Sequence, residues 1–147
     1  TQAINSMTPV FVTSDSQNVS YNCHSIKDKL NQMALDISKS VEIIEIMENY
    51  IESIRPEPAM RKQIDINYEI IDQSIIINEV RPAWNNPKEI LYHGYAKATF
   101  VHNKNVWKIY WKRANLKWSS YKPNPTVNLL SDFLKIVDEN EHACFKG

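Results

Sequence analysis

The fold is decided by a stretch in the middle of the chain in which apolar and polar side chains alternate. It reads Ile64-Asp65-Ile66-Asn67-Tyr68-Glu69-Ile70-Ile71-Asp72-Gln73-Ser74-Ile75-Ile76-Ile77-Asn78-Glu79-Val80-Arg81. A period of two is typical of strands that bury one face. Asp72 and Gln73 suit a tight turn, so the stretch predicts an antiparallel hairpin.

Three further strands are predicted after this hairpin. They span residues 90–102, 106–113 and 117–122, and short polar turns separate them. Gly94 predicts a bulge in the first of them, and Pro123 with Pro125 is expected to end the sheet. Because short connections join sequential strands, the sheet is expected to be an antiparallel meander of about five strands.

Helical patterns lie on both sides of these strands. Residues 30–54 carry apolar side chains at steps of three and four, with Ser38 or Ser40 as a point where a second helix would begin. A last helix is expected after a cap at Asn128. The fold class is therefore α+β, a meander sheet flanked by an N-terminal helical segment and a C-terminal helix.

The composition predicts one domain with a polar extension. Residues 1–28 are expected to form a polar N-terminal arm, and residues 29–147 a single α+β domain. The chain is long enough to bury a core without disulfides, and its two cysteines point to a reducing cytoplasm. It holds no apolar run of membrane-spanning length, and residues 1–9 do not resemble a signal peptide, so no membrane association is expected.

Charge is distributed unevenly along the chain. Residues 1–58 hold four basic and eight acidic side chains, whereas residues 59–147 hold thirteen and nine. The segment from Lys97 to Lys122 has seven basic residues, six aromatic residues and no acidic residue. Cations beside flat rings suit an anionic partner that carries bases.

Alternation divides the strand at residues 106–113 into two faces. Trp107, Ile109, Trp111 and Arg113 fall on one face, expected to be core, and Lys108, Tyr110 and Lys112 fall on the other. An open face of this kind predicts a nucleic-acid site in which Tyr110 stacks on a base while lysines contact phosphates. The predicted site comprises Lys97, Lys108, Tyr110, Lys112, Lys117 and Tyr121. The alternative is that lysine stems cover the sheet and Tyr110 pairs across strands.

A second group of residues suggests a catalytic alternative. Glu79, Arg81 and Lys97, with Asp65 or Glu69 on the neighbouring strand, are similar in type to metal-dependent nuclease centres. The competing interpretation is an ion network on the sheet surface.

A third group offers zinc ligands. Cys23-His24 and His142-x-Cys144 provide four soft ligands if the two ends of the chain meet, although neither spacing matches a zinc motif. Cys144 equally suits a small buried apolar position. With two glycines, the chain has no phosphate-binding loop, and no cofactor is expected. Trp84 is expected to plug the sheet edge.

Several stretches between residues 40 and 147 carry a resemblance to a known family. They are Glu79-Val80-Arg81-Pro82-Ala83-Trp84, Ala96-Lys97, Trp107-Lys108-Ile109-Tyr110-Trp111-Lys112-Arg113, Leu116-Lys117-Trp118, Tyr121, Pro123, Val137-Asp138 and Cys144-Phe145-Lys146-Gly147. In order and spacing the chain resembles a small bacterial family, domain of unknown function number 3024. That family carries Gly and an aromatic residue where this chain has Ala143 and Lys146. The resemblance implies no activity.

Three functions follow as hypotheses. The first is a non-enzymatic cytoplasmic module whose open sheet face binds an anionic partner, nucleic acid foremost. The second is a protein-interaction or homodimerisation domain that uses the acidic helix Val41–Ile54 or an exposed edge strand. The third is a metal-dependent nuclease centred on Glu79. A non-enzymatic role is favoured over an enzymatic one.

Overall fold

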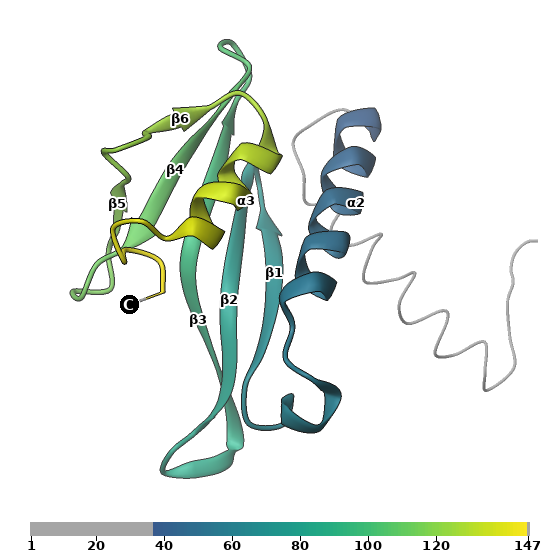
Figure 1. Cartoon of the computed structure of the whole chain (residues 1–147), viewed down its shortest axis with the longest axis vertical. Coiled ribbons are helices and arrows are strands. Elements are labelled where there is room, and N and C mark those ends of the chain that lie inside the picture. The colour runs from purple at the N-terminus through teal and green to yellow at the C-terminus, as the bar shows by residue number, and fades with distance from the viewer. Residues whose placement is uncertain (1–36, 147) are drawn as a thin grey trace, which may run out of the picture.

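A meander of antiparallel strands forms the centre of the fold in a computed structural model that describes residues 37–146 (Figure 1). In sheet order the strands are β1 (Asp65–Ile71), β2 (Ser74–Ala83), β3 (Asn86–Val101), β4 (Val106–Lys112) and β5 (Trp118–Ser120). The helices are α2 (Ile37–Ile54), the short 3-10 helix η1 (Pro58–Met60) and α3 (Leu130–Glu139). The predicted α+β architecture is confirmed.

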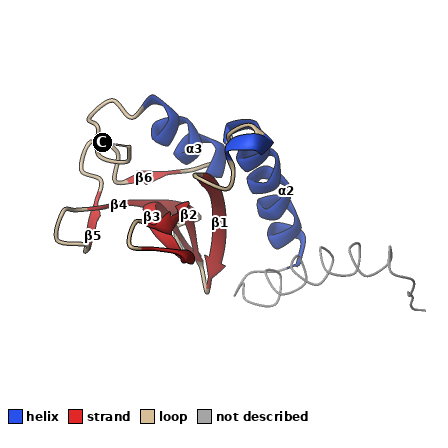
Figure 2. Cartoon of the chain, turned by 90° about the horizontal axis from the view of Figure 1, so that it is seen from below, coloured by secondary structure: helices blue, strands red, loops and turns tan. Residues whose placement is uncertain are grey.

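Helices α2 and α3 lie on the same side of the sheet (Figure 2). The core between them and the sheet includes Trp107, Ile109 and Phe133, all essentially inaccessible to solvent. Ala96 and Ala98 of β3 are also fully buried, and their small side chains leave room for the larger core residues. Neither described helix has the length and apolar character needed to cross a membrane.

The predicted bulge in β3 is confirmed. Ile77 pairs with Ala96, but the next residue, Asn78, pairs with Gly94, which leaves Tyr95 as the extra residue. A Cβ atom on Gly94 would lie 2.9 Å from Ile76 Cγ2, closer than van der Waals contact allows. Glycine is therefore needed here for space.

A sixth strand, β6 (Thr126–Val127), corrects the prediction that the prolines end the sheet. Thr126 pairs with Lys108 and Val127 with Trp107, so β6 continues along β4 beyond β5. Between the two short strands, the backbone N–H of Ile109 donates to the carbonyl of Pro125 at 3.0 Å. Proline lacks only the donor, so its carbonyl can still join the ladder.

Two predictions about helix ends were wrong. Helix α2 runs without a break through Ser40, whose side chain is buried, so no second helix begins there. At α3 the N-cap is Leu129, and no side chain caps the helix. The apolar face of each helix, which covers the core, determines its extent more than the nearest polar residue does.

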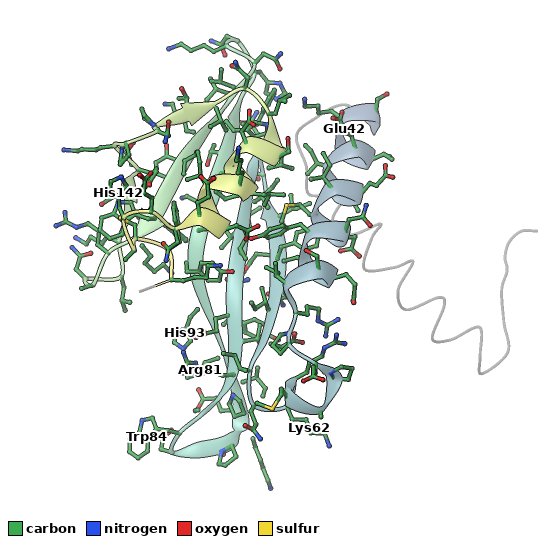
Figure 3. The ribbon with its side chains drawn as sticks, in the orientation of Figure 1. Glu42, Lys62, Arg81, Trp84, His93 and His142 are labelled. Atoms are coloured by element: carbon green, nitrogen blue, oxygen red, sulfur yellow. The ribbon has the colours of Figure 1, made fainter. Side chains whose placement is uncertain are left out.

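The β2–β3 hairpin extends beyond the helices and carries Trp84 near its tip (Figure 3). The side chain of Trp84 is 94% exposed, so the expectation that it plugs the sheet edge was wrong. β2 and β3 have 10 and 16 residues, whereas β1 and β4 have 7 each. The hairpin end of β2 and β3 therefore extends beyond the neighbouring strands.

Candidate functional site

Side chains of three neighbouring strands share the sheet face that lies opposite the helices. Lys97 pairs with Tyr110, and Lys112 pairs with Trp118, so these four side chains point the same way. Lys108 follows on the same face of β4 and is exposed. We call Lys97, Lys108, Tyr110, Lys112 and Trp118 the basic face.

The rings and cations of the basic face are in contact. Lys97 Nζ lies 4.9 Å from the ring centroid of Tyr110 and 5.0 Å from that of Trp118. Lys112 Nζ lies 4.7 Å from the Trp118 ring. Two ammonium groups thus lie at cation–π distance from Trp118, and they concentrate positive charge near this half-buried indole.

Charge on this face is asymmetric. In the described part of the chain, no carboxylate pairs with Lys97, Lys108 or Lys112. Glu69 lies across the sheet on β1 and accepts a hydrogen bond from Asn78 Nδ2 at 2.9 Å. The pKa of Lys97 is lowered by burial and by the neighbouring charge of Lys112. Positive potential therefore gathers over β4 and β5.

The structure corrects one residue of the predicted nucleic-acid site and adds another. Tyr121 is 2% exposed and packs on the covered face, with its ring 5.0 Å from that of Phe145. It cannot stack with a partner on the basic face. Trp118 takes that place, because Ser120 is the residue that pairs with Tyr110. Lys117 is exposed in the β4–β5 turn, at the margin of the face.

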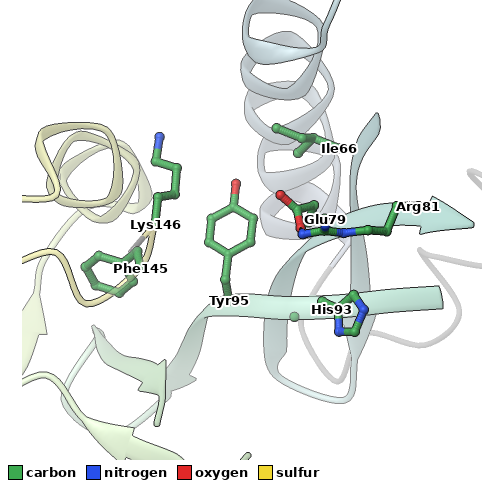
Figure 4. Close-up of a pocket in the computed structure, with 8 residues that line it drawn as sticks. Ile66, Glu79, Arg81, His93, Tyr95, Phe145 and Lys146 are labelled. Carbon is green, nitrogen blue, oxygen red and sulfur yellow. The ribbon is translucent and has the colours of Figure 1, made fainter. Parts of the chain in front are cut away.

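The predicted grouping of Glu79, Arg81 and Lys97 is wrong in its geometry. Glu79 pairs with His93 on the helix side of the sheet, whereas Lys97 points to the opposite side. Glu79 accepts a hydrogen bond from Arg81 Nη2, and both line a pocket of about 370 Å³ with His93 and Tyr95 (Figure 4). Spacing along one strand could not reveal this, because the faces of two strands depend on their register.

The carboxylates expected to assist Glu79 are engaged elsewhere. Asp65 accepts two hydrogen bonds from Arg55, at 2.7 and 2.9 Å, and Arg55 lowers the pKa of Asp65. Glu69 is on β1 and points to the opposite side of the sheet from Glu79, where it accepts a hydrogen bond from Asn78. Among residues 37–146, no three histidine, cysteine or acidic side chains group closely enough to hold a metal ion. Within residues 37–146, Asp65, Glu69 and Glu79 are therefore not grouped as the prediction required.

Tyr95 is the pocket residue that the sequence did not reveal. Its hydroxyl is buried and has no hydrogen-bond partner in the described structure. Burial, together with the charges of Asp138 and Glu79, raises the pKa of Tyr95 to about 12. The bulge beside Gly94 places this ring in the pocket, and a bulge changes which face a side chain takes.

Half of the predicted zinc site can be located. Cys23 and His24 lie outside the described residues. Cys144 Sγ donates to the carbonyl of His142 at 3.7 Å, and the His142 ring lies 6.2 Å from Tyr121. Cys144 therefore has a contact within the C-terminal tail, and the His142 ring lies near Tyr121, just after β5.

A comparison with known protein families shows what this chain is similar to. A sequence model of a family described as "Domain of unknown function (DUF3024)" matches residues 36–147. No curated protein and no solved structure matches the chain.

Proposed function

Because the chain belongs to the DUF3024 family, whose description assigns no activity, we propose from its own geometry that it is a non-enzymatic binding module of the cytoplasm. Its ligand is single-stranded nucleic acid, held on the basic face. The bases stack on exposed rings, and the phosphates lie near the lysines.

The observation that carries this proposal is the position of two lysine ammonium groups near the ring of Trp118. Lys97 Nζ and Lys112 Nζ lie 5.0 and 4.7 Å from the centroid of its ring. A base that stacks against the exposed part of this indole brings its phosphates within reach of both ammonium groups. Stacking of one base on an aromatic side chain contributes about 1–3 kcal/mol.

The shape of the surface supports a single strand over a duplex. The basic face is a sheet surface, and it presents neither a helix nor a hairpin that enters a groove. Tyr110 lies beside Trp118 and gives a second ring at strand spacing. Unpaired bases offer ring faces to such a surface, whereas a duplex hides them.

The test is fluorescence anisotropy of labelled single-stranded and duplex DNA and RNA at low and physiological salt. Lys108→Glu with Lys112→Glu is expected to weaken single-strand binding by about tenfold or more and to reduce its salt dependence. Lys62→Glu with Lys135→Glu is the matched control, because both lysines are exposed and lie off the basic face. Equal losses in both double variants would show that only net charge matters, and the basic face would then be rejected.

A second candidate function is protein interaction through the β2–β3 hairpin. Trp84, Ile90 and Tyr92 are exposed there, and an exposed group of large apolar side chains often marks an interface. The acidic side of α2 stays a prediction for the same role. Light scattering with Trp84→Ala separates the candidates, since loss of self-association without loss of nucleic-acid binding favours the protein interface.

A further inference from the structure

A cavity of about 490 Å³ lies at the β4–β5 edge of the sheet. We call it the edge pocket. The residues that bear on its chemistry are Trp111, Arg113, Ser119, Ser120, Lys122 and Pro123. Ser119 pairs with Trp111 and shares its face, whereas Ser120 pairs with Tyr110 and points toward the basic face. Trp111, Arg113 and Lys122 are not part of the basic face, so the pocket can be tested separately from the function proposed above.

The polar groups of the edge pocket are not used within the described part of the fold. Arg113 and Lys122 form no ion pair there, and the hydroxyls of Ser119 and Ser120 form no hydrogen bond. By contrast, Arg81 in the pocket of Figure 4 already bonds Glu79. Two cations and the Ser119 hydroxyl, on the face of Trp111, are therefore available to a ligand at this edge.

Trp111 adds an unused ring. Sequence alternation places it with Trp107, and it is half-buried on the covered side of the sheet. Trp107 packs against Phe100 at 5.0 Å, and Trp118 contacts two lysines, but Trp111 has no ring or cation partner among residues 37–146. Part of this indole lines the pocket wall and can receive a flat group.

The charge of the pocket is positive. Among its described lining residues none carries a carboxylate, and Arg113 and Lys122 are the charged side chains. Burial raises the pKa of the Tyr121 hydroxyl, and the charges of Cys144, Glu141 and Glu139 add to this effect. Glu141 and Glu139 are not among the residues that line the pocket.

We propose that the edge pocket binds a nucleotide, with the base against Trp111 and the phosphate between Arg113 and Lys122. The volume falls in the range of about 300–1,000 Å³ that is usual for small-molecule sites. The hydroxyl of Ser119, which shares a face with Trp111, supplies a hydrogen bond to the same phosphate or to the sugar. The nucleotide is either free or the end of a nucleic-acid strand.

The first experiment titrates adenosine and uridine 5′-monophosphates and follows tryptophan fluorescence. Saturable quenching is expected, and it should disappear in Trp111→Phe while it persists in Trp118→Phe. Arg113→Glu and Lys122→Glu should each weaken binding by roughly tenfold. Lys104→Glu, in the exposed β3–β4 turn, is the control and should bind as the unchanged protein does. Absence of saturable quenching, together with unchanged binding of phosphorylated strand ends in Lys122→Glu, would overturn the proposal.

The second experiment separates the two sources of the nucleotide. A 5′-phosphorylated linear oligonucleotide is compared with a circle of the same sequence, which has no end. If Lys122→Glu weakens binding of the linear strand alone, the pocket holds a strand end; if it affects only monophosphates, the pocket holds a free nucleotide. Equal weakening for the circle would mean general attraction and would reject the pocket. Failure of the basic face would appear instead as unchanged circle binding in the Lys108→Glu and Lys112→Glu variant.

Discussion

Trp107 and Trp118 lie on opposite faces of one sheet, and their surroundings differ accordingly. Trp107 is 1% exposed and packs against Phe100 beneath the helices. Trp118 is half-buried and has two ammonium groups near its ring, at 5.0 and 4.7 Å from the centroid. Both residues have lysine as a sequence neighbour, so local composition does not distinguish them. The two residues are distinguished by the face of the sheet that each one occupies.

This difference gives the two faces of the sheet different roles. The covered face gains free energy by removing apolar surface from water. The open face keeps cations and rings at its surface, where they add little to stability and remain available to a partner. Substitutions on the covered face should therefore change the free energy of unfolding, and those on the open face should change binding.

The largest expected effect compares these two rings directly. Trp107→Ala should lower the free energy of unfolding by about 3–5 kcal/mol, because it leaves a cavity in a closely packed core. Trp118→Ala should cost roughly 1 kcal/mol, since its ring is partly hydrated already and loses mainly cation–π contacts. Urea denaturation measures both values. Equal losses would show that Trp118 is a core residue and that the two faces do not differ as described.

The next effect concerns Gly94, which lies directly against the Trp118 ring. In Gly94→Ala the new Cβ would lie 2.9 Å from Ile76 Cγ2, 3.1 Å from Asn78 Oδ1 and 3.3 Å from Trp118 Cζ2. Relief of these contacts should cost about 1–3 kcal/mol and displace the indole. His93→Ala, one residue away and exposed, should stay within about 0.5 kcal/mol.

Binding gives Gly94→Ala a second measurement. If the indole moves away from the lysines, single-strand affinity should fall even under conditions where the variant is fully folded. A variant that loses stability but keeps its full affinity would indicate that Trp118 does not contact the nucleic acid.

Alternation within a strand was sufficient to predict the two faces of β4. It placed Trp107 and Ile109 in the core, with Lys108 and Tyr110 opposite, as the structure has them. It could not predict which residue of β5 would join Tyr110, because that depends on the turn before Trp118. Leu116 in this turn has a φ of 66°, a conformation that its side chain does not predict.

The remaining misses have related causes. β6 has only two residues, too few for a periodic pattern, and it forms because Thr126 and Val127 return to β4. Glu79 and Lys97 were grouped by residue type, although the register of β2 on β3 puts them on opposite faces. Register between strands is a property of the whole sheet, and it was the information missing for the site.

A smaller effect is expected at two buried tyrosines on the covered side. The hydroxyl of Tyr95 has no partner in the described region, whereas that of Tyr50 donates to Asp138 Oδ1 at 2.7 Å. Tyr95→Phe should raise the free energy of unfolding by about 1 kcal/mol, and Tyr50→Phe should lower it by a similar amount. Denaturation at pH 7 measures both. A loss of stability in Tyr95→Phe would mean that the hydroxyl has a partner, such as a bound water.

The pH dependence of Tyr95 provides an independent test. Its pKa is raised from 10.0 to about 12 in the folded protein, so the neutral form is favoured by folding. The corresponding stability is complete below pH 10 and is lost as pH rises from 10 to 12, by up to about 1.4 kcal/mol per pH unit. Tyr95→Phe should lose stability less steeply over this interval. Identical slopes would contradict the raised pKa.

The smallest effect lies in the C-terminal tail that closes the covered face. Ala143 has a φ of 53°, in the left-handed region that favours glycine, the residue expected there from the family resemblance. The tail is held independently, since Asn140 Oδ1 accepts hydrogen bonds from the backbone N–H groups of Phe145 and Lys146 at 3.1 and 3.3 Å. Ala143→Gly should therefore relieve backbone strain without moving Phe145, and raise stability by about 0.5–1 kcal/mol. Leu116→Gly, with its φ of 66° in the turn beside the basic face, is the matched variant and should gain as much. Thermal unfolding measures both; a gain at Leu116 but a loss at Ala143 would mean that the alanine methyl contributes packing to the covered face that outweighs the strain of its backbone.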